Sequence, residues 1–295
     1  MPLLTRLRDR SGYTVIELLV GLVLFAIVGT MIMGLLSTNR RSSDLQTQRI
    51  DVQQNLRTAT ALLSSELRQL DASDGDIKAM SATSLTIRAM RQFGVICSIP
   101  TLGGALTGLN MTVRLPLYSA SRNFAAGDSL FVWYEGDAST RNDDGWLLAA
   151  VTAVANLNCP DGTSGQKLTV NLAVNGALSP PQLNKAGVVT VGGPVRGFET
   201  VVYAVGTGSD GRSYLNLTTN GSTYALIGPL TGSSGVNFTY YAANGAVTAT
   251  PASVALIGIV VREQSDSKVY SNAAAQGYVS DSAMTAVALR NNPRF

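Results

Sequence analysis

The stretch RDRSGYTVIELLVGLVLFAIVGTMIMGLL, residues 8–36, contains an apolar run with one carboxylate in it. Residues 13–36 are uncharged except for Glu17. A helix of about 24 residues is long enough to cross a hydrocarbon core of roughly 30 Å. We therefore predict a membrane-spanning helix at residues 13–36.

The charges around this run predict its orientation. Arg6, Arg8 and Arg10 precede it, and Arg40 and Arg41 follow it. Arginines nearest the start usually dominate the positive-inside tendency, so we expect the N-terminus inside and the bulk of the chain outside the inner (cytoplasmic) membrane. A cleaved secretory signal would have a shorter apolar core and a small-residue cleavage site. A plain signal anchor is the alternative, but it gives no reason for a glutamate.

Glu17 needs a partner. A carboxylate inside hydrocarbon costs on the order of 2.5–3.5 kcal/mol at the centre of a span and less near an edge. No lysine or arginine lies within two turns of Glu17 inside the run. Cleavage after Gly12 would create an α-amino group on Tyr13, four residues before Glu17. We predict that this amine neutralises the glutamate of a neighbouring subunit and so sets the register of assembly.

The segment SGYTVIELLVGLVLFAIVG, residues 11–29, resembles the N-terminal motif of type IV prepilins. In this resemblance Gly12 ends a leader peptide of residues 1–12, and Tyr13 becomes the N-methylated first residue. Glu17 matches the glutamate at the fifth mature position. The departures are Tyr13 for the usual Phe and Val15 for the usual Leu. The resemblance implies a prepilin peptidase that cleaves and methylates the chain, which then needs no active site of its own for these steps.

The helix is predicted to continue as an amphipathic segment, residues 37–72. Its apolar residues recur at helical spacing and form one stripe: Leu45, Val52, Leu56, Ala59, Leu63, Leu67 and Leu70. The sequence DASDGD, residues 71–76, signals the end of the helix. Three glycines in the first half, Gly21, Gly29 and Gly34, favour close helix packing, with local unwinding in a fibre as the alternative.

Residues 77–295 are predicted to form one extracytoplasmic, mostly antiparallel β domain. Short alternating segments are typical of strands: 84–90, 129–136, 146–154, 167–174, 198–206, 213–219, 237–243, 254–263 and 283–291. Asp-Gly or Asn-Gly pairs at 144–145, 210–211, 220–221 and 244–245 favour tight hairpins, because their central residues tolerate positive φ. The predicted fold class is α+β, a long N-terminal helix packed on a β domain, as in pilins.

The last strands resemble the C-terminal hairpin and final strand of larger proteins of the same kind. The segments GVNFTYYAANGAVTAT (235–250), VALIGIVVRE (254–263) and AMTAVALRN (283–291) carry this similarity. The proteins concerned are the larger minor pilins and the J-type pseudopilins of type II secretion. The resemblance rests on strand order and the terminal LRN, and it favours these classes over a small major pilin.

The chain has no histidine and two cysteines, Cys97 and Cys159. Without histidine, a histidine-based triad is excluded and a zinc site is disfavoured. Two cysteines in a chain that leaves the cytosol can form one disulfide, closing a loop of about 60 residues. A pair of buried free thiols is the alternative. The sequence predicts no catalytic residue, metal, cofactor or direct nucleic-acid partner.

Two further residue groups have a structural and a functional interpretation. Asp71, Asp74 and Asp76 surround Gly75, but the spacing lacks the ligand pattern of a calcium loop, so a helix-terminating turn is the favoured interpretation. Five tyrosines suggest a carbohydrate-binding surface or, more simply, half-buried strand positions: Tyr203, Tyr214, Tyr224, Tyr240 and Tyr241.

Together these patterns predict a structural subunit, a minor pilin processed by prepilin peptidase and assembled into a type IV pilus or a type II secretion pseudopilus. The expected partners are other pilin or pseudopilin subunits, inner-membrane lipid and the assembly platform. The alternative function is a fibre-tip adhesin or DNA-uptake subunit with the same anchor. An anchored envelope enzyme would need a catalytic constellation that the sequence does not show.

Overall fold

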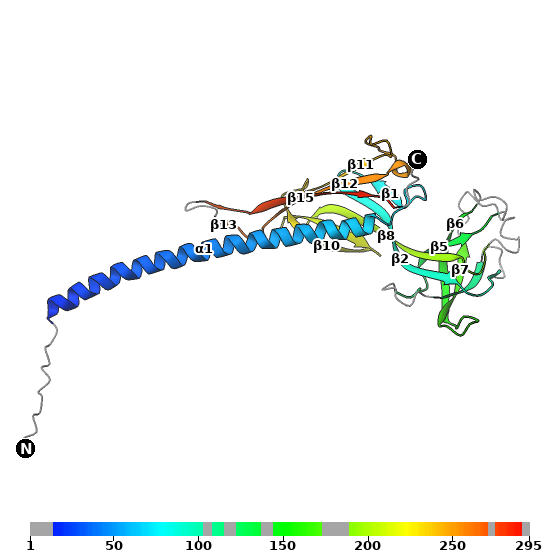
Figure 1. Ribbon diagram of the computed structural model, residues 1–295, viewed down its shortest axis with the longest axis horizontal. Helices are drawn as coiled ribbons and strands as arrows, with labels where there is room; N and C mark the ends of the chain where they lie inside the picture. Colours follow the sequence, from blue (N-terminus) through cyan, green and yellow to red (C-terminus); the bar gives the residue numbers. More distant parts are fainter. Residues whose placement is uncertain are drawn as a thin grey trace, which may run out of the picture. The chain divides into compact units, whose positions relative to one another are not determined.

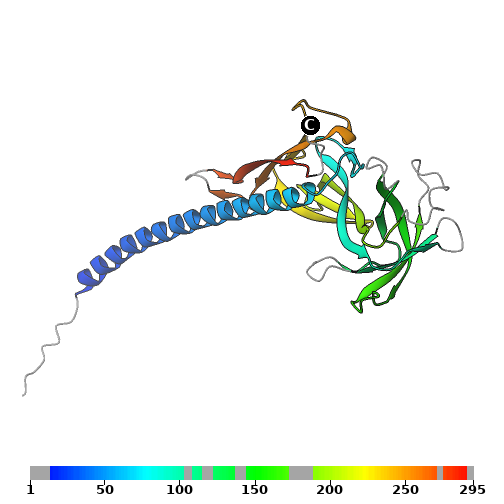
Figure 2. The ribbon, with the colours of Figure 1, turned by 45° about the vertical axis from the view of Figure 1, so that its right-hand side comes forward.

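A computed structural model describes residues 14–102, 108–114, 122–136, 144–172, 189–270 and 275–290. The chain divides into two units, which we treat separately. The first comprises residues 1–54 and 264–281, and the second comprises residues 55–263 and 282–295. Figures 1 and 2 show the long helix α1 as one continuous ribbon that belongs to both.

Helix α1 runs from Val15 to Leu67, 53 residues. Its first half exposes large apolar side chains, from Val15 to Leu36, whereas its second half buries a stripe. The predicted stripe is confirmed, because Val52, Leu56, Ala59, Leu63, Leu67 and Leu70 are all buried and Leu45 is half-buried. The helix ends at Leu67, before the anticipated residue 72, because turns follow at 68–69 and 72–75, so the buried Leu70 lies just beyond the helix.

Among the described residues the strands follow the helix in chain order, together with the short 3₁₀ turn η2. Their bounds are β1 (Ile77–Met80), β2 (Ser84–Ile96), β3 (Thr101–Leu102), β4 (Gly108–Arg114), β5 (Ser129–Tyr134), β6 (Gly145–Asn156), β7 (Gly165–Leu172), β8 (Pro194–Thr207), β9 (Ser213–Thr219), β10 (Ser222–Leu230), β11 (Val236–Tyr241), η2 (Pro251–Ser253), β12 (Leu256–Gln264), β13 (Val269–Tyr270), β14 (Gln276–Gly277) and β15 (Ser280–Ala288). The α+β class with a mostly antiparallel sheet is therefore confirmed.

Among the described residues, thirteen strands form one sheet. Eleven of them follow the path β1-β2-β4-β7-β6-β5-β8-β9-β10-β12-β11, and β3 and β15 lie off this path, paired to β4 and β12. An additional pairing joins β2 to β8, from Ser84 opposite Ala204 to Val95 opposite Pro194. This pairing closes β2, β4, β7, β6, β5 and β8 into a ring, a small antiparallel barrel whose green strands β5, β6 and β7 are labelled in Figure 1. Beyond β8 the sheet continues through β9, β10 and β12, with β15 also paired to β12.

The interior of the ring is apolar. Its buried side chains alternate along the strands, as barrel interiors require: Ile96, Leu109, Met111, Val113, Leu130, Val132, Leu147, Ala149, Val151, Leu168, Val170 and Val195. The buried stripe on the second half of α1 does not belong to this ring interior. It lies in a second apolar core, on the part of the sheet outside the ring, and the long strands β2 and β8 take part in both cores.

Several strands are longer than the sequence pattern indicated or were not indicated at all. The hairpin β9–β10 turns at Asn220 and Gly221, which both have positive φ (49° and 77°), so the Asn-Gly prediction at 220–221 is confirmed. Its second strand, β10, was not predicted because STYALIGPL contains Gly228 and Pro229. Such residues usually mark loops rather than strands.

The first unit contains the N-terminal part of α1 and a two-stranded ribbon of β13 and β14, with Val269 opposite Gly277 and Tyr270 opposite Gln276. The guanidinium of Arg41 lies 4.2 Å from the centre of the Tyr270 ring. A cation over an aromatic face at this distance is attractive. The ribbon therefore contacts α1 five residues after Leu36, the last residue of the predicted span.

Candidate assembly site on the long helix

The N-terminus of α1 is closed by a reciprocal pair of hydrogen bonds. The backbone N–H of Thr14 donates to Glu17 Oε2 at 2.9 Å, and the Thr14 hydroxyl donates to the same oxygen at 3.0 Å. The backbone N–H of Glu17 donates back to Thr14 Oγ1 at 3.3 Å. This is a capping box, in which Thr-x-x-Glu satisfies N–H groups that a helix start otherwise leaves unpaired.

Sequence analysis missed this role of Glu17. The signal was present in TVIE, residues 14–17, immediately before the apolar run. Both bonds from Thr14 end on Glu17 Oε2, and among the described residues no hydrogen bond is seen to the other carboxylate oxygen. Gly12 and Tyr13 lie outside the described residues, and their assigned roles stay predictions.

The surface of the helix after this cap is apolar and uncovered. Among the described residues, α1 is the one helix that is long and apolar enough to cross a membrane. None of its most apolar 18-residue segment is buried. The Phe25 side chain, for example, is 79% exposed. A Cβ atom added at Gly21, Gly29 or Gly34 would meet nothing within 4 Å. These glycines are therefore not needed for packing within the chain and are free to admit a neighbouring helix closely.

The hydroxyl groups in this half of the helix are satisfied locally. Thr30 donates to the carbonyl of Ile27 at 2.8 Å, and Ser37 and Thr38 donate to the carbonyl of Gly34 at 2.9 and 3.0 Å. Such back-bonding removes the need for water at these positions. The surface from Val15 to Leu36 can thus lie in lipid or against other apolar helices with its side-chain hydroxyls paired.

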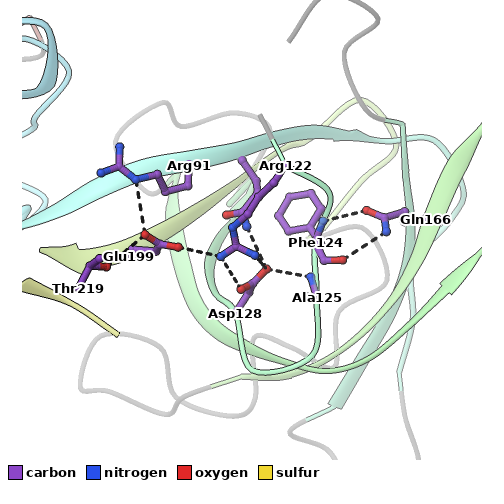
Figure 3. A network of polar contacts seen from close by, with 9 residues as sticks. Arg91, Arg122, Phe124, Ala125, Asp128, Gln166, Glu199 and Thr219 are labelled. Atoms are coloured by element: carbon purple, nitrogen blue, oxygen red, sulfur yellow. Dashed lines mark hydrogen bonds and ion pairs between the residues drawn. The ribbon is translucent and has the colours of Figure 1, made fainter. Parts of the chain in front are cut away.

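A network of charged side chains joins Arg91, Glu199, Arg122 and Asp128 (Figure 3), and Arg91 also reaches the C-terminal end of α1. Arg91 on β2 contacts Glu66 of the helix at 2.8 Å and Glu199 of β8 at 3.6 Å. Arg122 bridges Glu199 and Asp128, both at 2.9 Å. The hydrogen bond from Arg122 to Asp128 raises the pKa of the guanidinium. Each carboxylate of this network has a cationic partner, so the network holds the end of the helix against the strands.

The end of the helix is closed by a turn built on two aspartates. The Asp71 carboxylate accepts hydrogen bonds from the backbone N–H groups of Ser73 and Asp74 at 3.0 and 3.2 Å. Asp76 Oδ2 accepts the N–H of Asp71 at 2.9 Å, and Gly75 has φ of +77°. This arrangement confirms the helix-terminating turn. Among the described residues no three His, Cys, Asp or Glu side chains form a group that could hold a metal ion.

Cys97 and Cys159 form a disulfide, with their Cα atoms 5.6 Å apart and 62 residues apart in sequence. The bond links the end of β2 to the connection between β6 and β7, two parts of the six-stranded ring. The Cys97 N–H donates to the Thr112 carbonyl at 2.9 Å, and the Cys159 N–H donates to that of Thr163 at 2.8 Å. Of the two alternatives left by the sequence, the structure has the disulfide.

The five tyrosines do not form one exposed set. Tyr203 and Tyr240 are buried, and the Tyr240 hydroxyl donates to the Ser81 carbonyl at 2.9 Å. Tyr214 and Tyr241 are half-buried, whereas Tyr224 is 58% exposed. The strand interpretation therefore describes these residues better than a shared carbohydrate-binding surface.

A cavity of about 180 Å³ lies in the second unit, beside the second half of α1. It is lined by Asn55, Thr58, Ala59, Leu62, Leu226, Ile227, Gly228 and Glu263. Glu263, near the end of β12, is only 1% exposed, and burial raises the pKa of its carboxyl to about 7. Nothing in the sequence pattern distinguished this glutamate from the exposed charges around it.

Stability should fall between pH 5 and pH 8 because of Glu263. In the unfolded chain the carboxyl titrates near 4.5, so between this value and about 7 only the folded state holds the proton. The stabilisation present at low pH is then lost, by up to roughly 3 kcal/mol at 1.4 kcal/mol per pKa unit. Asp76, whose pKa is raised to about 6 by burial, acts in the same direction.

Denaturant midpoints at pH 5 and pH 8 measure this effect on the full-length chain in detergent. Glu263→Gln should be more stable than the original protein at pH 8 and should show a smaller loss between the two pH values. Glu135→Gln, at an exposed position, is the matched control and should keep the original pH dependence. Identical pH profiles for Glu263→Gln and the original protein would contradict the assignment.

The comparison with protein families agrees with the N-terminal geometry. Residues 7–33 match the model described as the prokaryotic N-terminal methylation motif. The comparisons with curated proteins and with solved structures each give no significant match. The match contains the capping box and most of the exposed apolar surface. The N-terminal segment is therefore similar to the methylation motif of prepilins, and the helix that begins within it is long and apolar enough to cross a membrane.

Proposed function

We propose that the chain is a minor pilin, a low-copy structural subunit of a type IV pilus or a type II secretion pseudopilus. The observation that carries this proposal is the methylation motif at residues 7–33, which contains the start of an uncovered apolar helix. A long β domain, rather than a short major-pilin domain, follows the helix. The similarity of its closing strands to larger minor pilins and J-type pseudopilins supports the subtype.

The mechanism is assembly in two stages. Before assembly, residues 13–36 hold the chain in the inner membrane, with the leader 1–12 inside and the β domain on the opposite side. Prepilin peptidase then cuts between Gly12 and Tyr13 and methylates the new amine, which keeps its positive charge. The assembly platform moves the helix from lipid into a fibre, where other helices cover the same apolar side chains.

Glu17 has two tasks in this mechanism. Through Oε2 it caps its own helix by way of Thr14, and through Oε1 it receives the amine of a neighbouring subunit. In a site of low dielectric constant a charge pair is strong only where both charges are present and well placed. A subunit in the wrong register would leave one charge unpaired, so the pair selects the correct stagger between helices.

The direct test is the intact mass of the native membrane form. We expect a polypeptide that begins at Tyr13 and carries one methyl group. In a host that lacks prepilin peptidase, the same protein should keep residues 1–12 and add no methyl group. The sheared surface fraction of the normal host should contain the mature form. A native membrane form that still begins with the arginine leader would rule out the proposal.

A further inference from the structure

Glu263 is a buried carboxylate for which the described part of the chain supplies no partner. Both of its oxygens lack a hydrogen bond to any described residue, and its side chain is 1% exposed. Buried polar groups are nearly always hydrogen-bonded, and an unpaired buried charge is strongly unfavourable. Such a group is therefore a candidate for binding a ligand or exchanging a proton.

The cavity that Glu263 lines combines apolar walls with a few polar groups. Its walls include the apolar side chains of Leu62, Leu226 and Ile227, and its polar members besides the glutamate are Asn55 and Thr58. An apolar cavity of about 150 Å³ is known to hold a benzene molecule. The volume of about 180 Å³ is therefore sufficient for a short alkyl chain with a polar head.

The described residues supply no cation to this carboxylate. Glu263 is the one titratable side chain among those that line the cavity. Arg262, its neighbour in β12, alternates to the other side of the strand and donates to the carbonyl of Ser234 at 3.4 Å. A hard metal ion needs several oxygen ligands, and a lone carboxylate does not provide them.

We propose that this cavity binds a primary ammonium or guanidinium group on a short apolar stem, with Glu263 as its ion-pair partner. The stem packs on Leu62, Leu226 and Ile227, and the head group takes the place of the proton on the carboxyl. The two Glu263 oxygens are shielded from solvent in the structure. The Glu263 side chain therefore has to turn toward the cavity to meet the incoming cation. This chemistry is found in a lysine or arginine side chain of an adjacent fibre subunit and in free polyamines.

The first experiment uses n-butylammonium as the probe and the full-length protein in detergent at pH 8. With a dissociation constant of about 10 mM, a concentration of about 50 mM should raise the melting temperature by about 2–4 °C. Butan-1-ol, which has the stem without the charge, and sodium chloride at equal ionic strength should each have a much smaller effect. This measurement needs no fibre, so it tests the cavity independently of the proposed pilin role.

Variants assign the effect to the site. Glu263→Gln should lose the stabilisation by butylammonium, and Glu135→Gln should retain it. The proposal is overturned by a shift that butan-1-ol reproduces, by one that persists in Glu263→Gln, or by no shift at all. Because Glu263→Gln is expected to fold at least as stably at pH 8, loss of the effect in this variant is not explained by unfolding.

A second measurement distinguishes the two sources of the cation. A photo-crosslinking amino acid at Asn55, an exposed helix residue at the edge of the cavity, is introduced into assembled fibres. Cross-linking to a lysine- or arginine-containing peptide of a neighbouring subunit, reduced by butylammonium, assigns the site to fibre assembly. Binding of butylammonium without such a cross-link assigns it to a free amine.

Discussion

A Glu17→Gln variant should be processed normally and yet enter fibres at least about tenfold less than the original protein. Glutamine at this position of a capping box can still bond to the backbone, so the helix start is retained. The negative charge is lost, and the methylated amine of the neighbouring subunit then lies unpaired among apolar helices. Removing one partner of a buried pair typically costs 3–5 kcal/mol, more than the 1.4 kcal/mol that corresponds to tenfold.

The matched control is Thr14→Ala, which removes the cap and keeps the charge. Loss of a capping side chain costs about 1 kcal/mol, so incorporation should fall only a few-fold. The measurement is quantitative immunoblotting of sheared fibres against total membrane protein, with intact mass as the check on cleavage. The opposite ranking, with Thr14→Ala defective and Glu17→Gln normal, would make Glu17 a helix-capping residue and nothing more.

The observed cap at Glu17, beside the register role proposed for it, shows what sequence reasoning emphasised and what it omitted. Its unusual position among apolar residues directed attention to an intermolecular charge. The local spacing from Thr14 was equally informative, since a capping box is a four-residue pattern that needs no knowledge of the fold. The helix itself was predictable from length, periodicity and the DASDGD turn, because each depends on residues that are close in sequence.

The six-stranded ring could not be predicted in the same way. It closes through pairing of residues 84–95 with 194–204, about a hundred residues apart, and local alternation carries no information on such partners. The strand β10 was missed because Gly228 and Pro229 normally interrupt strands. The buried state of Glu263 likewise depends on the side chains that converge from α1 and β10. These are properties of packing, not of local pattern.

Closure of the ring protects the edges of its own strands. Each barrel strand is paired on both sides, so the ring itself has no open edge for unwanted association. The long strands β2 and β8 belong to the barrel and to the helix-covered sheet at once. The ion pairs of Arg91 on β2 with Glu199 on β8 and with Glu66 also link these two strands to the end of the helix.

Replacing both Cys97 and Cys159 with alanine should lower the free energy of unfolding of the second unit by about 4 kcal/mol. The disulfide closes a loop whose ends are 62 residues apart. Removing such a cross-link enlarges the conformational freedom of the unfolded chain by approximately that amount in the chain-entropy model. Alanine is chosen because Cys159 is buried and a serine hydroxyl there would add a separate cost.

Denaturant unfolding of the full-length protein measures this loss of stability. The fluorescence of Trp133 on β5 and Trp146 on β6 reports it from within the barrel, where the disulfide lies. Hydrogen exchange should increase most in the barrel strands β4, β6 and β7 and much less in β11. Ser98→Ala, next to one cysteine but with the bond intact, is the control and should lose about 1 kcal/mol for its hydrogen bond to the Thr112 N–H. A double variant within 1 kcal/mol of the original protein would show that the disulfide is not what holds the ring closed, and that β2–β8 pairing and the apolar interior suffice.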